Sequence, residues 1–525
     1  MRYIIKEMKT VGKVGVVITA ATAVLAGGIF FYKRKRNTEP EDEEERHRRQ
    51  YAAELYLPKP AEVLRKDLIQ EMRLDIKLMK EHNIVHVDHL IEWCGDTDEI
   101  SVNPLLLNDE ESERLGLPLK SLVPPGSFCI KDFQFSNENQ LKETARYMKA
   151  GPKRYMYFRK NEVKAAIVTC GGLCPGLNVV IREIVMTLHW NYNVTKIFGV
   201  RWGYSGFYET GENYVELTPE KVKEIQQLGG SILGAGRDVF DAERVLNAIL
   251  EHQINQVYII GGDGTHKGIL KLSELIKKRS LRISLVGVPK TIDNDIKIID
   301  YSFGFSSAIQ AAVEAINSAH VEATCVKNGI GLLKLMGRDV GHIAMHASLA
   351  SREVNVCLVP EFAFNLDGKE GVLNYIFDKM LKNIGYCVIV VAEGAALGVK
   401  DRNLVKEGED PRNVDIGLLL KKEILAYAKQ NNLETTLKYI DPSYIIRTVP
   451  ANSADSQYCS VLAQNAVHGA MAGFTNFTSG SVREVSVNLP IDLIANGEKN
   501  RLVYEDRAWQ RLLATTNQPS FMDYS

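Results

Sequence analysis

Two short turns that carry carboxylates suggest the chemistry of this 525-residue chain. In 261-GGDGT-265, Asp263 stands among three glycines. A carboxylate suits Mg²⁺, which prefers few carboxylates together with phosphate oxygens and water, and glycines let main-chain N–H groups approach a phosphate. The turn therefore indicates a site for phosphate groups together with a magnesium ion. A plain turn capped by the aspartate is the alternative that the residue types leave open.

The second turn, 289-PKTIDND-295, carries Asp293 and Asp295 two residues apart, with Lys290 and Thr291 beside them. One carboxylate can take the proton of an attacking hydroxyl while the other holds a metal ion or orients the first. A neighbouring lysine favours ionised carboxylates and can meet the charge of a transferring phosphoryl group. This turn predicts the acceptor side of a phosphoryl transfer. Its alternative is an aspartate-rich surface turn before a helix.

Two further glycine-rich turns predict contacts to phosphate. Residues 169-TCGGLCPGLN-178 contain Gly172 and precede a helix expected near Asn178, whose positive end would face a bound phosphate. Residues 228-LGGSILGAGRD-238 present Arg237 on a flexible loop, where a guanidinium can bridge phosphate oxygens. The alternatives are a turn that serves only tight packing and a loop arginine that is merely solvated.

Seven apolar runs are predicted to form the strands that position these turns, and they cover 163–170, 194–200, 256–262, 283–289, 329–335, 354–360 and 386–394. Near-continuous Val and Ile runs are typical of strands buried on both faces. They alternate with helical stretches, which predicts a doubly wound α/β architecture. Two such lobes would leave a crevice at the carboxyl ends of their strands, where the turns lie.

Seven motifs, in this order and spacing, resemble those of 6-phosphofructokinases; they are TCGGLCPGLN, LGAGRD, GGDGT, PKTIDND, KLMGRD, AEG and PSYIIR. The chain is most similar to the ATP-using members of the long-chain branch, which includes plant and kinetoplastid forms and resembles the pyrophosphate-dependent enzymes. The resemblance covers about residues 90–480. It implies two Rossmann-like lobes and the transfer of the γ-phosphoryl group of Mg-ATP to the 1-hydroxyl of fructose 6-phosphate, a step of glycolysis.

The resemblance also implies roles for individual residues. ATP would be bound by Gly172, Arg237, Asp238, Gly262, Asp263, Gly264 and Thr265, with Asp263 on Mg²⁺. Fructose 6-phosphate would be bound by Thr291, Asp293, Asp295, Met336, Gly337, Arg338, Glu393, Tyr444 and Arg447. Asp293 would be the catalytic base, and Arg338 and Lys290 would meet the developing charge. Arginine binds phosphate bidentately, which agrees with Arg447 gripping the 6-phosphate beside Tyr444.

Two positions point to different donors. The pyrophosphate-dependent enzymes carry Asp where this chain has Gly264, and an Asp would repel the α-phosphate of a nucleotide. Lys290, in contrast, resembles the pyrophosphate-dependent enzymes. Gly264 bears directly on the nucleotide, so ATP is the predicted donor and pyrophosphate the alternative. NAD kinases and lipid kinases share only GGDGT. A catalytically idle, membrane-tethered regulatory subunit is a further alternative. Such a subunit would be free to lose Asp263, Asp293, Arg338 or Arg447, and this chain keeps all four.

The composition is that of a soluble enzyme, with 45% hydrophobic and 25% charged residues. It excludes a disordered chain, a fibrous protein and a membrane protein with many spans. The net charge of −1 gives no reason to expect nucleic acid as a partner. The eight cysteines form no CxxC pair and no histidine cluster accompanies them, so a zinc site is not expected. A chain of this size does not need disulfide bonds, which indicates reduced thiols and a compartment that faces the cytosol. A homo-oligomer, dimer or tetramer, is implied by the resemblance.

Residues 14–32 form an uncharged run with basic flanks, and 33-KRKR-36 should stay on the cytosolic side. We expect an anchor in an organelle membrane; a cleaved organellar presequence and a disordered tail are the alternatives. The predicted divisions are the anchor and charged linker (1–50), an N-terminal extension (51–160), an ATP-binding lobe (161–320), a sugar-phosphate lobe (321–480) and a C-terminal arm (481–525).

Overall fold

The computed structural model describes residues 61–95, 100–104, 122–132, 144–236, 240–400 and 410–521, without the side chains of 61–64 and 102. The chain divides into two units, Met1–Leu64 and Arg65–Ser525, and the site lies in the second. The predicted anchor at 14–32 and the charged linker lie outside the described residues. Within the described ranges, no helix is both long and apolar enough to cross a bilayer.

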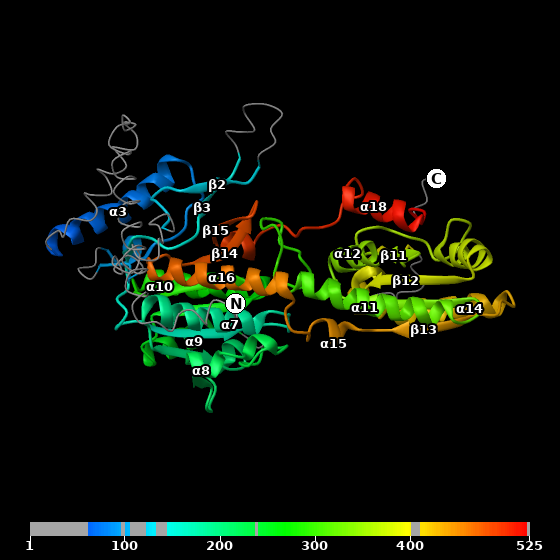
Figure 1. Ribbon diagram of the computed structural model, residues 1–525, viewed down its shortest axis with the longest axis horizontal. Helices are drawn as coiled ribbons and strands as arrows, with labels where there is room; N and C mark the ends of the chain where they lie inside the picture. Colours follow the sequence, from blue (N-terminus) through cyan, green and yellow to red (C-terminus); the bar gives the residue numbers. More distant parts are fainter. Residues whose placement is uncertain are drawn as a thin grey trace, which may run out of the picture. The chain divides into compact units, whose positions relative to one another are not determined.

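A nine-stranded mixed sheet forms the first lobe (Figure 1). Its five central strands, β14, β9, β8, β5 and β6, are parallel to one another, and the outer strands pair antiparallel. In spatial order the strands are β2 (Phe128–Ile130), β3 (Arg146–Lys149), β15 (Val485–Pro490), β14 (Phe477–Val482), β9 (Ser284–Pro289), β8 (Gln256–Gly261), β5 (Lys164–Thr169), β6 (Lys196–Val200) and β7 (Tyr214–Glu216).

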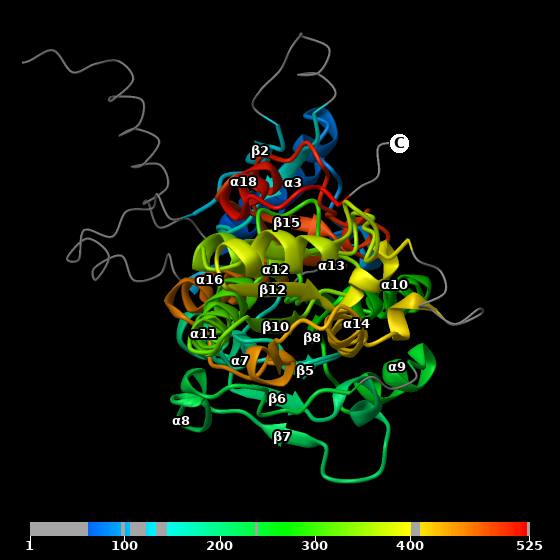
Figure 2. The same ribbon diagram turned by 90° about the vertical axis from the view of Figure 1, so that its right-hand side faces the viewer.

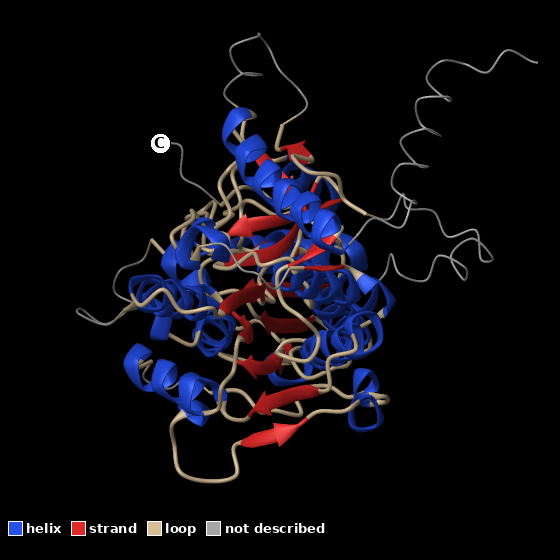
Figure 3. Ribbon diagram, turned by 90° about the vertical axis from the view of Figure 1, so that its left-hand side faces the viewer, coloured by secondary structure: helices blue, strands red, loops and turns tan. Residues whose placement is uncertain are grey.

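Helices lie on both sides of the row of strands (Figure 3), as a doubly wound fold requires. The long helix α16 (Ser453–Met471) packs against α7 (Leu177–Met186) and contacts β9, β14 and β15. The helix α10 (Asp263–Lys278) contacts β8 and β9, and it also packs on α9 (Ala242–Glu251) and α17 (Asp492–Ala495). The further elements before β9 are α3 (Ala61–Glu81), α4 (Leu90–Cys94), β1 (Ser101–Val102), β4 (Tyr155–Met156), α8 (Pro219–Val222), a π-helix at Thr187–Asn191, and 3-10 turns at Gly203–Phe207 and Ile225–Gln227.

A four-stranded parallel sheet forms the second lobe, in the order β11 (Val356–Leu358), β12 (Tyr386–Ala392), β10 (Gly329–Leu335) and β13 (Thr436–Ile440). Helices α11 (Phe305–Thr324), α12 (His342–Ser351) and α14 (Ile416–Gln430) pack against it (Figure 2). The remaining elements are α13 (Val372–Asn374), a π-helix at Tyr375–Leu381, 3-10 turns at Glu393–Gly398 and Pro411–Asn413, α15 (Ser443–Ile446) and α18 (Arg507–Thr516).

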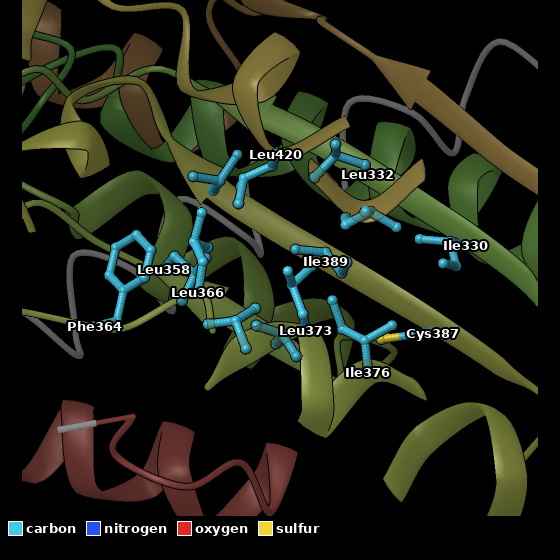
Figure 4. Packing of buried hydrophobic residues seen from close by; sticks show 14 of the residues in the cluster. Ile330, Leu332, Leu358, Phe364, Leu366, Leu373, Ile376, Cys387, Ile389 and Leu420 are labelled. Atoms are coloured by element: carbon cyan, nitrogen blue, oxygen red, sulfur yellow. The ribbon is translucent and has the colours of Figure 1, made fainter. Parts of the chain in front are cut away.

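The core of the second lobe explains how its strands are held in place (Figure 4). Leu332 of β10 and Ile389 of β12 are fully buried, and they share one apolar cluster with Leu358 of β11 and Leu420 of α14. Phe521, far along the chain, belongs to the same cluster. Truncating a buried leucine of this kind to alanine typically costs about 2–5 kcal/mol of stability. The ends of β10 and β12, which carry site residues, are therefore anchored by a dense core.

All seven predicted strand segments contain a strand, from β5 through β12. The lobes, however, do not follow the predicted residue ranges. The chain returns from the second lobe to the first, where α16, β14 and β15 complete the nine-stranded sheet, and it then crosses again so that α18 packs on α12. The predicted boundary at 480 therefore falls within β14, and β2 and β3 of the predicted N-terminal extension belong to the first sheet. The strands β2, β3 and β14 are short or polar, and only tertiary pairing defines them.

Candidate active site

A cleft of about 320 Å³ opens where the carboxyl ends of strands from both sheets meet. Parallel α/β sheets typically bind ligands at this edge. The cleft is lined by Gly172, Leu173, Gly262, Asp263, Lys290, Thr291, Ile292, Asp293, Asp295, Lys334, Met336, Gly337, Arg338, Glu393, Asp441, Ser443, Tyr444 and Arg447. Every predicted substrate-binding residue is among them, together with Gly172, Gly262, Asp263 and Lys290.

The glycine-rich turn after β5 forms one wall of the cleft. Lys290 Nζ donates a hydrogen bond to the carbonyl oxygen of Gly172 at 2.9 Å, which joins this turn to the end of β9. Gly171 N donates to Gly236 O at 2.8 Å, so the glycine loop 231–236 is also fixed to the end of β5. The helix that follows begins at Leu177, one residue before the expected position.

The turn after β8 places Asp263 at the first position of α10, with Gly262 as the N-cap. Burial and the negative charge of Asp295 raise the pKa of Asp263 above its usual value. A Cβ built on Gly264 would have no heavy atom within 4 Å. The protein itself therefore does not require glycine at this exposed position, and the room that it leaves is room for a ligand. Thr265 is buried, and its carbonyl oxygen accepts from Tyr204.

The turn after β9 holds Asp293 in an environment suited to a base. Burial, and next the charge of Asp295, raise the pKa of Asp293 to about 7. Its Oδ1 is buried and has no hydrogen-bond partner among the described residues. The turn is braced because Thr291 Oγ1 donates to Asp295 Oδ1 at 2.7 Å and accepts from Asp293 N at 3.3 Å. A base that titrates near neutral pH can take a proton from a hydroxyl.

A lysine that the sequence analysis did not single out lies among the carboxylates. Lys499 Nζ donates to Asp295 Oδ2 at 2.8 Å and to Asp339 Oδ2 at 3.0 Å, and it lies 3.7 Å from Asp263 Oδ2. Burial opposes the charged form, but the hydrogen bonds to Asp295 and Asp339 dominate and raise the pKa of Lys499. The ammonium group is therefore permanently charged at physiological pH.

The opposite wall comes from the second lobe. Arg338 Nε donates to Glu393 Oε1 at 3.1 Å, which pairs the ends of β10 and β12. Gly394 N donates to Gly337 O at 2.9 Å. The Arg338 side chain is about three-fifths exposed, so its guanidinium faces the cleft with donors to spare. This arrangement can bind an anionic group between the lobes.

The far end of the cleft is basic and aromatic. The Arg447 guanidinium lies 4.6 Å from the centre of the Tyr444 ring, and Arg447 Nε is buried without a hydrogen-bond partner among the described residues. Lys334, which the sequence analysis also did not single out, forms ion pairs with Asp415 at 2.8 Å and Asp441 at 2.9 Å. A bound phosphate would accept a hydrogen bond from this unpaired Nε of Arg447, beside the Tyr444 ring.

Two predicted nucleotide-binding residues, Arg237 and Asp238, lie outside the described residues. Sequence reasoning missed three lysine and aspartate residues, Lys499, Lys334 and Asp441. Lys499 is a single charged residue in a polar segment, whereas Lys334 lies within the apolar run 329–335. No local pattern distinguishes Lys499 from a solvated residue. One signal was available, because Lys334 opens the motif KLMGRD and Asp441 directly precedes PSYIIR.

The carboxylates fit a magnesium ion. Asp263 offers a hard oxygen ligand at the mouth of the cleft, next to main-chain N–H groups and to the open space over Gly264. Mg²⁺ is typically held by one or two carboxylates together with substrate phosphates and water. The donor set present is therefore of the right chemical kind for a metal that arrives with a nucleotide.

Comparison with known proteins gives concordant results. A sequence model of the family described as Phosphofructokinase matches residues 164–470. The chain is 48% identical over 380 residues to ATP-dependent 6-phosphofructokinase 7 of Arabidopsis thaliana. This match covers 72% of this chain and 78% of that protein. It is 44% identical over 383 residues to ATP-dependent 6-phosphofructokinase of Borreliella burgdorferi, covering 71% of this chain and 85% of that protein. The crystal structure of a pyrophosphate-dependent phosphofructokinase from Marinobacter aquaeolei shares the fold, with a TM-score of 0.56 at 21% identity, covering 69% of this chain and 93% of that one.

Proposed function

The chain belongs to the phosphofructokinase family, and from this membership and the site we infer that it is an ATP-dependent 6-phosphofructokinase. It transfers the γ-phosphoryl group of ATP to the 1-hydroxyl of fructose 6-phosphate, which is a step of glycolysis. The observation that carries this conclusion is the cleft itself. One cavity brings together Asp263 of the donor turn, Asp293 of the acceptor turn and basic residues from both lobes.

Asp293 takes the proton of the 1-hydroxyl as that oxygen attacks the γ-phosphorus. Its buried Oδ1, which no described group engages, is the acceptor. Lys290 and Arg338 lie in the same cleft and meet the negative charge that develops on the phosphoryl oxygens. Glu393 orients Arg338 and accepts from a sugar hydroxyl, while Tyr444 and Arg447 bind the 6-phosphate. Phosphoryl transfer depends mainly on such positioning and electrostatics.

Asp263 would hold a magnesium ion, with its phosphate and water ligands completing the shell. When bound there, the ion would neutralise part of the charge of the nucleotide phosphates. Gly172, Gly262 and the N-terminus of α10 supply main-chain N–H groups for the same phosphates. Gly264 leaves the room that the α-phosphate needs, and Thr265 closes the turn from the buried side.

A second donor, pyrophosphate, is the competing hypothesis, and Lys290 is the observation that favours it. A donor comparison distinguishes the two. The purified full chain is given fructose 6-phosphate and Mg²⁺ with either ATP or pyrophosphate, and fructose 1,6-bisphosphate is followed. We expect turnover with ATP and at least a hundredfold less with pyrophosphate. Turnover with pyrophosphate alone would reverse the assignment, and turnover with neither would leave the idle regulatory subunit.

We further propose that the enzyme works as a homo-oligomer and that residues 14–32 attach it to an organelle membrane with the catalytic part facing the cytosol. The uncharged run and its basic flank support the attachment. Light scattering of the full chain tests the first proposal, and a molar mass of one chain would contradict it. Alkaline carbonate extraction tests the second, since an anchored chain stays with the membrane and a cleaved or soluble one does not.

A further inference from the structure

Lys499 lies on a segment that both lobes hold. Its main chain pairs antiparallel with Ile296, and Asn500 N donates to the carbonyl oxygen of Asp295 at 2.8 Å. On the other side, His342 Nε2 of α12 lies 2.8 Å from Asn500 O. The segment between α17 and α18 is therefore fixed against the acceptor turn of the first lobe and against the first turn of α12 in the second.

The side chain of Lys499 connects carboxylates of both lobes. Asp263 and Asp295 come from the first lobe and Asp339 comes from the loop that carries Arg338. Asp295 is buried, whereas Lys499 is about one-third exposed. A buried carboxylate is stable only when it is paired, and here the ammonium group supplies that pairing.

Hydrogen bonds continue from Lys499 to the base. Lys499 engages one oxygen of Asp295, Thr291 engages the other, and Thr291 Oγ1 accepts from the main chain of Asp293. The position of Asp293 therefore depends on a residue that lies 206 positions later in the chain. A displacement of about 1 Å in such an arrangement can cost about a hundredfold in rate.

We propose that Lys499 is a positioning residue for phosphoryl transfer. It ties the acceptor turn to the Arg338 loop across the cleft by pairing with Asp263, Asp295 and Asp339. The role in transfer rests on the proposed function. A second consequence of the pairing, for metal binding, does not depend on the proposed function. A divalent cation that enters alone competes with the ammonium group for Asp263, whereas a metal–nucleotide complex brings phosphate ligands of its own.

The test compares three variants of the full chain. Lys499→Met removes the charge and keeps most of the volume, and Lys499→Arg keeps the charge. Lys297→Met is the matched control, because Lys297 forms an exposed ion pair with Glu498 beside the same segment. We expect Lys499→Met to lower kcat at least tenfold, with a smaller change in the KM for ATP. Lys499→Arg should recover kcat to within about threefold of the wild type, and Lys297→Met should stay within twofold.

The second readout is binding of Mn²⁺ alone, measured by electron paramagnetic resonance without nucleotide or sugar. Lys499→Met should bind Mn²⁺ at least fivefold more tightly than the wild type, and Lys297→Met should not. If the wild type proves inactive on fructose 6-phosphate, the proposed function fails while this measurement still decides the metal part. If Lys499→Met does not fold, Asp339→Asn breaks the same tie from the other lobe and should also lower kcat. A folded Lys499→Met with wild-type kcat and unchanged Mn²⁺ binding overturns the proposal.

Discussion

Gly394 lies directly against the main chain of Arg338, and a Cβ at Gly394 would overlap the carbonyl oxygen of Arg338. The contact joins the end of β12 to the loop after β10. It places Glu393 within hydrogen-bond distance of Arg338, at 3.1 Å. The sugar-phosphate side of the cleft therefore depends on a glycine whose role is steric rather than chemical.

Replacing this glycine by alanine should damage sugar-phosphate binding. In Gly394→Ala the new methyl group must displace the Arg338 loop, and overpacking of this kind costs about 1–3 kcal/mol. We expect the KM for fructose 6-phosphate to rise about tenfold or more, with a smaller change in the KM for ATP. Equal kinetics for wild type and Gly394→Ala would refute the steric role.

The turn 261–265 predicts which substitution would weaken the use of ATP. Gly264→Asp adds a carboxylate where the phosphates of ATP are expected, and like charges placed together cost several kcal/mol. We expect kcat/KM for ATP to fall about a hundredfold. The melting temperature should change little, because nothing in the protein occupies that space. Gly264→Asn has nearly the same size without the charge and should lose much less. Losses of equal size would show that bulk, rather than charge, matters.

The raised pKa of Asp293 predicts how kcat/KM falls as the pH is lowered. The pKa of about 7 lies well above the ordinary value for an aspartate, because burial and Asp295 disfavour the charged form. The base works only when it is ionised. The value of kcat/KM, which reports the free enzyme, should therefore fall about tenfold per pH unit below pH 7. A profile that stays flat down to pH 5 would show that Asp293 is not the titrating base.

Buried neutral histidines predict acid-sensitive stability. Burial lowers the pKa of His89, His266 and His468 to about 4, against roughly 6.5 in an unfolded chain. As the pH falls from 6.5 to 4, the unfolded chain binds protons that the folded chain does not, so stability is lost in this window. Each histidine should cost about 2 kcal/mol at pH 5.

Urea unfolding at pH 7.5 and pH 5 measures this loss. His468 accepts or donates a hydrogen bond with the Tyr192 hydroxyl at 2.6 Å, and glutamine can make a similar bond without titrating near pH 6. His468→Gln should therefore lose less stability between the two pH values than the wild type does. Equal losses in the two proteins would mean that His468 does not contribute.

The sequence predicted the parts of the fold that depend on local pattern. The buried strands β5, β8 and β9 are continuous apolar runs, and turns that follow neighbouring parallel strands must meet at one edge of the sheet. This rule alone predicts that Gly172, Asp263 and Asp293 lie close together. The motif residues of the second lobe were placed by resemblance, and they line the same cleft.

The remaining features depend on tertiary pairing. The polar segment FTSGSV becomes the buried strand β14 because its neighbours β9 and β15 provide hydrogen bonds and apolar contacts. Lys499 stands in the charged stretch 498-EKNR-501, which reads as an ordinary solvated loop. Its role becomes visible only when the returning chain places it beside Asp295. A lone charged residue carries no local signal of its partner.

The central claim is that Asp293 activates the 1-hydroxyl of fructose 6-phosphate for attack on ATP. The most direct test is a single turnover with ATP labelled in the γ-phosphate, comparing the wild type with Asp293→Asn. We predict that the label appears in the 1-phosphate of fructose 1,6-bisphosphate and that Asp293→Asn slows its transfer about 10²–10⁴-fold in a folded protein. Transfer by Asp293→Asn at the wild-type rate would contradict this account.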